Sequence, residues 1–150
     1  MEFFDTTFLQ DNEIKLVVER VSEGDPIKGW VPAYYFGIYD FNGNKIGFCD
    51  LRVGYSDGLY YGGHIGYTVY EEHRGHHYAL KACKLMFELA KKHGMEYLYI
   101  TCNPANTPSR KTLEGLEGEL IEIAELPEDN DMRVRDGQTN VCVFKFDFKK

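Results

Sequence analysis

The sequence predicts a mixed α/β (α+β) domain whose sheet is mostly antiparallel, with one parallel βαβ unit near its centre. Two observations indicate this fold class. Short segments rich in β-branched and aromatic residues follow one another, separated by connections containing Gly, Asn and Pro. After the fourth such segment comes one long amphipathic helix, followed directly by another strand. The length of 150 residues fits a single domain, residues 1–150.

The first half of the chain is predicted to form four strands. Residues 14–21 (IKLVVERV) are rich in β-branched side chains, and residues 22–32 form a Gly- and Pro-containing loop. Asn42-Gly43-Asn44 tolerates the positive φ of a tight turn, so it predicts a hairpin. The hairpin strands are residues 34–40 and 46–53, and a Gly- and Tyr-rich connection, residues 54–63, leads to a fourth strand at residues 65–70.

The second half begins with a helix from Tyr78 to His93. Its apolar residues recur at spacings of three and four, and Gly94 ends it. The strand at residues 96–101 then completes the βαβ unit. Three further elements are predicted, a shorter helix and two strands with a polar connection at 127–139 between them: residues 106–116, 119–126 and 140–148.

The composition and charge argue against nucleic acid and membrane as binding partners. A net charge of −7 argues against a general nucleic-acid binder, because phosphate contacts need clustered Lys and Arg. The chain shows neither a signal peptide nor a run of about 18 apolar residues. The four cysteines are scattered and form no C-x-x-C pair, which is typical of reduced, buried thiols. The sequence therefore predicts a cytoplasmic protein that binds neither nucleic acid nor membrane.

The stretch YTVYEEHRGHHYA, residues 67–79, joins the fourth strand to the long helix. A helix start exposes unpaired N–H groups and the positive end of the macrodipole, which together attract phosphate. Gly75 allows close approach of a ligand to the backbone, and Arg74 adds a cationic donor beside it. Many strand-to-helix turns contain a Gly and an Arg and bind nothing, so a purely structural role stays open.

This stretch resembles the coenzyme-A loop of the GNAT (Gcn5-related N-acetyltransferase) superfamily, Arg/Gln-x-x-Gly-x-Gly/Ala. Arg74 takes the first position and Ala79 the last. The following ALKACKLMFELAKKHGMEYLYITC is similar to the helix and fifth strand of that family, and Asn106-x-x-Ser109 to its Asn-x-x-Ser segment. The resemblance covers about residues 46–126.

The sequence departs from the family pattern at two places. His77 stands where the family has its central Gly. The family also has two helices between its first two strands, whereas only residues 22–33 are available here, so the N-terminal helical region is shortened. Acceptor recognition is then expected from loops such as residues 54–63. Three tyrosines and a leucine of this region are candidates for an apolar or cation-binding acceptor pocket: Tyr55, Leu59, Tyr60 and Tyr61.

The resemblance implies an acetyl-CoA-dependent N-acetyltransferase whose acceptor is a primary amine of a small molecule or a peptide. It leaves a homodimer open. In the family, main-chain groups of the fourth strand hold pantetheine and thioester. This assigns that role, which includes catalysis, to Tyr67, together with Val69. The remaining cofactor-binding residues that it implies are those of the loop, with the helix start that follows it, and of the Asn-x-x-Ser segment: Arg74, Gly75, His76, His77, Tyr78, Ala79, Asn106 and Ser109.

Transfer to an amine needs a base, because the amine is largely protonated at neutral pH. His64, at the start of the fourth strand, is the leading candidate, and Glu71 and Glu72 come next. A hydrogen-bonded histidine at a strand end is the alternative interpretation of His64. Leu113 stands about where many family members carry a tyrosine that protonates the leaving thiolate, so the general acid stays unassigned.

Two other classes of function stay open. One is a non-catalytic acyl-CoA sensor or partner-binding module of the same fold. The other is a metal binder built on His73, His76 and His77. No nearby Cys or pair of carboxylates completes a tetrahedral set around these histidines, so no metal is expected.

Overall fold

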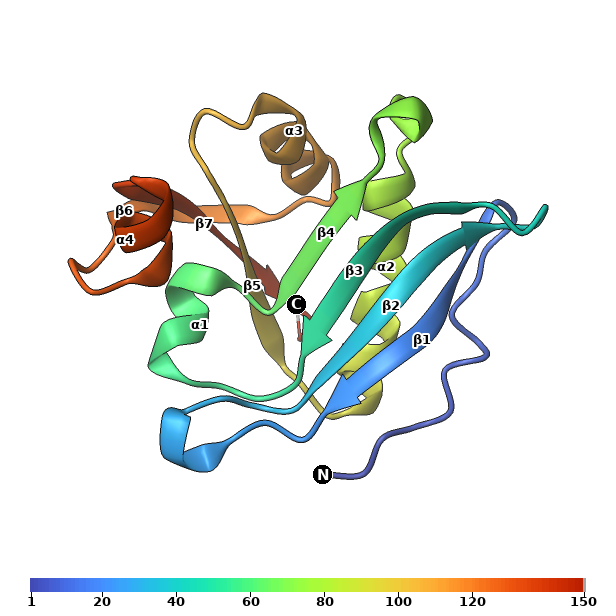
Figure 1. Cartoon of the computed structure of the whole chain (residues 1–150), viewed down its shortest axis with the longest axis horizontal. Helices are drawn as coiled ribbons and strands as arrows, with labels where there is room; N and C mark the ends of the chain where they lie inside the picture. The colour runs from blue at the N-terminus through green and yellow to red at the C-terminus, as the bar shows by residue number, and fades with distance from the viewer. Residues whose placement is uncertain (150) are drawn as a thin grey trace.

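Two antiparallel sheets lie side by side in the computed structural model, which describes residues 1–149 (Figure 1). The first sheet has the strand order β1-β2-β3-β4: Ile14–Ser22, Ala33–Asp40, Lys45–Arg52 and Ile65–Val69. The second has the order β5-β7-β6, and its strands are β5 (Tyr97–Cys102), β6 (Glu119–Glu125) and β7 (Asn140–Asp147). The mixed α+β class predicted from the sequence is confirmed.

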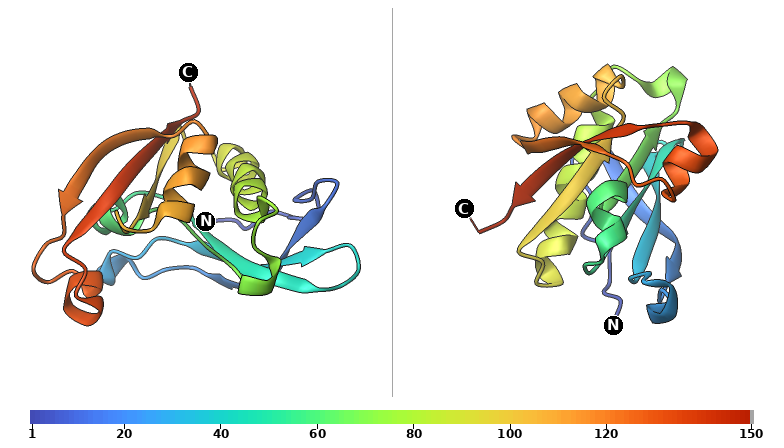
Figure 2. Two further views of the ribbon diagram at one scale, coloured as in Figure 1. Left: turned by 90° about the horizontal axis from the view of Figure 1, so that it is seen from above. Right: turned by 90° about the vertical axis from the view of Figure 1, so that its left-hand side faces the viewer.

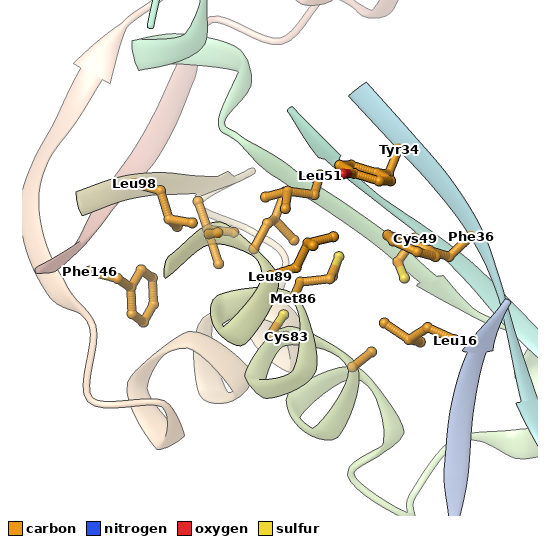
Figure 3. Packing of buried hydrophobic residues seen from close by; sticks show 14 of the residues in the cluster. Leu16, Tyr34, Phe36, Cys49, Leu51, Cys83, Met86, Leu89, Leu98 and Phe146 are labelled. Carbon is orange, nitrogen blue, oxygen red and sulfur yellow. The ribbon is translucent and has the colours of Figure 1, made fainter. Parts of the chain in front are cut away.

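The long helix α2 (Tyr78–Lys92) packs on one face of the first sheet, with α3 (Thr107–Gly115) beside it (Figure 2). Its buried residues, among them Met86 and Leu89, fill the space between the two sheets (Figure 3). Phe36 and Leu51 meet them from the first sheet, and Leu98 comes from the second. This shared core fixes the two sheets relative to each other, because close-packed interiors resist displacement.

The predicted strands and the two longer helices are present, with ends within two residues of expectation. The sequence missed four short elements: η1 (Pro26–Lys28), α1 (Asp57–Gly62), η2 (Glu71–His73) and α4 (Asp131–Asp136). Each is under two turns long, too short to show a helical period. The connection from β1 to β2 holds only η1, so the N-terminal helical region is shortened as expected.

Strands β4 and β5 flank α2 in the predicted βαβ order, but no hydrogen-bonded ladder joins them within residues 1–149. They meet at one end only, where the His64 N–H donates to the Tyr99 carbonyl at 2.7 Å. Beyond that point the strands diverge, and β5 pairs with β7 instead. The central parallel pair is therefore open at its carboxyl end.

The structure also places the cysteines and the apolar segments. Cys49, Cys83, Cys102 and Cys142 are all buried free thiols. None of the helices within residues 1–149 has the length and apolar character needed to cross a membrane.

Candidate active site

A cavity of about 670 Å³ occupies the gap between the diverging ends of β4 and β5. Its walls come from β4, the turn before α2, the end of β5 and the start of α3. It brings together nine of the residues predicted from the sequence: Tyr67, Val69, Arg74, Gly75, His77, Tyr78, Ala79, Asn106 and Ser109. His64 and His76 do not line it.

The main chain of β4 presents one edge to this cavity. At its two ends, the His64 carbonyl accepts from the Arg52 N–H at 2.7 Å, and the Tyr70 N–H donates to the Ile46 carbonyl at 2.9 Å. Antiparallel pairing alternates along a strand, so residues 66 and 68 turn their N–H and C=O groups to β3. Residues 65, 67 and 69 turn theirs away from β3, toward the gap. The edge expected to hold the pantetheine and the thioester is thus directed at the cavity.

The start of α2 has a geometry that suits an anion. His77 is the N-cap residue and has φ 61° and ψ 26°, the left-handed conformation usually taken by Gly. In the described part of the chain, no side chain caps this helix start. The N–H groups of Tyr78 and Ala79 therefore keep no intrahelical acceptor and point out of the helix. His77 thus stands at the position of the expected Gly in a conformation that Gly adopts readily, and for a residue with a side chain this conformation costs about 1 kcal/mol.

Arg74 and Gly75 precede this helix start. The Arg74 side chain is exposed, and its Nε donates to the Val69 carbonyl at 3.1 Å, which holds the guanidinium beside the end of β4. Gly75 has φ 92°, and no atom lies within 4 Å of the point where a Cβ would stand. A cation and an open stretch of backbone thus adjoin the free N–H groups.

Tyr67 reaches across the site from β4 to α3. Its hydroxyl lies 2.6 Å from the Ser109 Oγ, and burial raises the pKa of the phenol far above its usual value. Asn106 caps α3, because its Oδ1 accepts from the Ser109 N–H at 3.2 Å. The sequence indicated only a main-chain role for Tyr67. No sequence signal reveals the side-chain pair, whose members are 42 positions apart.

His64 is fully buried, and both of its ring nitrogens have partners. Nε2 donates to the Gly54 carbonyl at 2.8 Å, and Nδ1 accepts from the Tyr99 N–H at 3.0 Å. Burial lowers the pKa of the imidazole, so the ring is held neutral. This geometry corrects the expectation of a general base: the ring does not reach the cavity, and it ties β4 to β5 instead.

His76 was expected to bind the cofactor, but it does not line the cavity. His76 is exposed, and its ring packs against Tyr78 with 5.3 Å between the ring centroids. Within residues 1–149, no group of three His, Cys, Asp or Glu side chains is arranged to hold a metal ion. Leu113, at the position of the family tyrosine, is fully buried and supplies no proton.

Asp50 on β3 is a titratable group that the sequence did not single out. Burial raises the pKa of its carboxyl, although Arg52 lies 3.0 Å away. The Gly66 N–H donates to Asp50 Oδ1 at 3.0 Å. A Cβ on Gly66 would stand only 3.1 Å from the same oxygen, so the missing side chain leaves the room that the carboxylate occupies. Gly66 itself lines the cavity, which places Asp50 just behind its wall.

A second groove, of about 950 Å³, shares Gly62 and Met132 with the cavity. The connection from β1 to β2 forms one side, with Trp30 exposed, and α1 and α4 form the others. Arg52, the partner of Asp50, also lines this groove. An acceptor entering here would meet the cavity near the N-terminal end of β4.

Comparisons with solved structures agree with this architecture. Ribosomal-protein-S5-alanine acetyltransferase from Vibrio fischeri is 19% identical, with a TM-score of 0.62 over 79% of this chain and 63% of that one. RimJ from Mycobacterium smegmatis, in complex with CoA-disulfide, is 17% identical, with a TM-score of 0.60 over 78% and 54%. Microcin C7 self immunity acetyltransferase MccE, in complex with acetyl-CoA and AMP, is 15% identical, with a TM-score of 0.60 over 77% and 60%.

At such low identity the TM-scores show a shared fold alone, and the chain spans 54–63% of the length of the three proteins. No curated protein sequence gives a significant match. The sequence also matches the family model of the acetyltransferase (GNAT) domain over residues 7–118, well over half of the chain. The chain belongs to the GNAT acetyltransferase domain family.

Proposed function

We propose that this protein is an acetyl-CoA-dependent N-acetyltransferase that acts on a primary amine of a small molecule or a peptide. One observation carries the proposal: the uncapped start of α2 and the outward edge of β4 open on the same cavity. The first suits a pyrophosphate, and the second suits the amide groups of a pantetheine arm. The MccE complex with acetyl-CoA, in a protein of the same fold, supports this ligand.

The residues of the cavity fit coenzyme A by charge and by shape. The N–H groups of residues 75–79 and the Arg74 guanidinium would bind the phosphates. The main chain of Tyr67 and Val69 would align the pantetheine arm, and Asn106 would close its other side. Acetyl-CoA supplies an activated thioester, and the chain orients it and excludes water.

Tyr67 is the residue that we assign to protonate the leaving thiolate. Tyr67 and its partner Ser109 both line the cavity, and the phenol is protonated at neutral pH, since burial raises its pKa. With the Ser109 hydroxyl as the donor in their hydrogen bond, the proton of the phenol stays free for the thiolate. The phenol approaches from β4, and not from α3, where Leu113 is buried.

Asp50 is the residue that we assign as the base. Its pKa is raised toward the range in which a carboxylate accepts a proton at neutral pH. Gly66 separates it from the cavity, and its partner Arg52 faces the acceptor groove. A proton from the amine would therefore reach Asp50 through a bridging water. His64, sealed on both nitrogens, is not available for this step.

The test combines a binding and a turnover measurement. Acetyl-CoA should raise the melting temperature, because a ligand of the native state stabilises it. Adding a panel of small amines and peptides should then release free thiol in an amine-dependent manner. Absence of thermal stabilisation at saturating acetyl-CoA would contradict the assignment of the cavity.

A non-catalytic acyl-CoA module is the second candidate, favoured by the burial of Leu113 at the position of the family acid. It predicts the same thermal stabilisation and no release of thiol with any amine. The two functions are therefore separated by the second measurement alone.

The Tyr67→Phe variant tests the acid. The phenyl ring keeps the packing, so KM for acetyl-CoA should stay near the wild-type value while kcat falls about 10- to 100-fold, less than the full range for acid catalysis because a thiol leaves readily. Ser109→Ala is the matched control, since it removes only the partner of the phenol and should lower kcat less. An unchanged kcat in Tyr67→Phe would remove the phenol from the mechanism.

A further inference from the structure

A third cavity, of about 560 Å³, opens beside α1, and no residue of the described chain lines both it and the acetyl-CoA cavity. It lies on the face of β5 opposite to Leu98 and Ile100, which are buried in the core. Its walls are mostly aromatic, and five tyrosines form them: Tyr55, Tyr60, Tyr61, Tyr97 and Tyr99. We refer to it as the tyrosine pocket.

The rings of the pocket are packed against one another. Tyr55 and Tyr97 have centroids 4.8 Å apart, Tyr60 and Tyr99 5.1 Å, and Tyr97 and Tyr99 5.5 Å. From the sequence, Tyr55, Tyr60 and Tyr61 were expected to line one acceptor pocket with Leu59. Leu59 is buried and does not line this cavity. The two tyrosines of β5 complete the wall, which only the folded structure brings to α1.

Two of the hydroxyls are bound to the protein. The Tyr55 hydroxyl donates to the Tyr97 carbonyl, and the Tyr60 hydroxyl donates to a Glu122 carboxylate oxygen. The bond to Glu122 raises the pKa of Tyr60 to about 12, so this phenol is neutral. These bonds fix the Tyr55 and Tyr60 rings and use their hydroxyl groups.

The charges around the pocket favour a cation. Asp57 is the acidic side chain among its lining residues, and neutral His64 closes the base. Lys145 lies outside the lining, and its Nζ stands 4.7 Å from the centroid of the Tyr97 ring. This positive charge opposes a second cation at the Tyr97 ring, so the attraction comes from Asp57 and from the other tyrosines. The faces of tyrosine attract cations through the ring quadrupole.

We propose that the tyrosine pocket binds an organic cation of the alkylated or quaternary ammonium class. The lining carries hydroxyl groups as well as the Asp57 carboxylate, but most of its residues are aromatic and suit the methyl groups of an alkylated ammonium. An ammonium whose protons are replaced by methyl groups needs no acceptors and keeps its charge. Binding at this pocket goes beyond the proposed acetyl transfer and does not depend on it.

Choline is the probe, titrated by calorimetry or by ligand-observed NMR in the absence of acetyl-CoA. Its matched control is 3,3-dimethylbutan-1-ol, which has the same shape and no charge. Choline should bind saturably, in the range of about 1 mM, and the neutral alcohol about tenfold more weakly. Equal binding of the two ligands, or no saturation by choline up to ~50 mM, would overturn the proposal.

Three variants locate the site. Tyr55→Leu removes an exposed ring and should weaken choline binding about fivefold or more, whereas Tyr55→Phe should leave it near wild type. Asp57→Asn, at an exposed position, should weaken it about two- to threefold. Far-UV circular dichroism verifies that each variant is folded. Undiminished choline binding in both Tyr55→Leu and Asp57→Asn would place the ligand elsewhere and contradict the proposal.

Discussion

The two ends of β4 are built in opposite ways. At the N-terminal end, the main-chain groups and both ring nitrogens of His64 have protein partners, so no hydrogen-bonding group of this residue is left for a ligand. At the other end, the edge residues Tyr67 and Val69 face a cavity, and the following helix starts without a cap. The closed end holds β4 against β5 and so fixes how far apart the strands stand at the open end. The same strand is thus held to β5 at one end and presents main-chain groups to the cavity at the other.

The largest expected effect comes from breaking the closed end. His64→Ala leaves the Tyr99 N–H and the Gly54 carbonyl buried without their partner, and it creates a cavity. We expect a loss of about 3 kcal/mol in the free energy of unfolding, measured by urea denaturation. Wild-type stability in this variant would mean that His64 is no anchor.

The pH dependence of stability also tests the structural role of His64. The folded-state pKa of His64 lies below its ordinary value of 6.5, so the unfolded chain takes up a proton first as pH falls through that range. Wild-type protein should therefore lose stability below about pH 6.5. His93, whose pKa burial also lowers, contributes to the same slope. Denaturation of His64→Ala at several pH values should show a shallower slope, and an equal slope would contradict this account.

The next effect concerns the base behind the open end. Asp50→Asn keeps the size of the side chain and removes its basicity, so kcat should fall about 100-fold at neutral pH. In the wild type, kcat/KM should rise with pH through an apparent pKa above the ordinary aspartate value of 3.8. That limb should disappear in Asp50→Asn. Arg52→Lys, which keeps the charge beside Asp50, is the control, and an intact limb in Asp50→Asn would assign the base elsewhere.

Arg74→Glu tests the phosphate site. Reversing an exposed charge beside the start of α2 should weaken the binding of coenzyme A about tenfold in calorimetry, through repulsion, and leave the melting temperature unchanged. Glu71→Gln, in the same turn and outside the cavity lining, is the control and should change affinity little. Unchanged affinity in Arg74→Glu would count against this location of the phosphates.

The smallest effect comes from His77→Gly. Gly adopts a φ of 61° without the steric penalty of a side chain, which should stabilise the fold by up to about 1 kcal/mol. Coenzyme A affinity should stay within about twofold, because the main chain binds the phosphates. A large loss of affinity would instead assign a direct ligand contact to the His77 ring.

Local structure could be predicted from the sequence wherever residues close together in the chain determine it. Asn42-Gly43 predicted its hairpin, the apolar period predicted α2, and the family pattern identified the loop from Arg74 to Ala79. The sequence could not predict the backbone conformation of His77, because a non-Gly residue takes a positive φ only when its surroundings require it.

Contacts between segments far apart in the chain could not be predicted from the sequence. The orientation of His64 depends on Gly54 and Tyr99, which come from two other segments. The pairing of Tyr67 with Ser109 and the space that Gly66 gives to Asp50 likewise arise only when strands and helices pack together. Residue type alone favoured His64 as the base, because its ordinary pKa suits the task, and burial removed that advantage.

The most direct test of the central claim is an amide-resolved NMR titration of the protein with coenzyme A. The account predicts that the largest changes fall on the N–H groups of Tyr78 and Ala79 at the start of α2 and of Tyr67 and Val69 on the edge of β4. The His64 N–H, already bonded to Tyr99, should change little. Tight binding that leaves those four N–H groups unchanged and shifts others instead would contradict it.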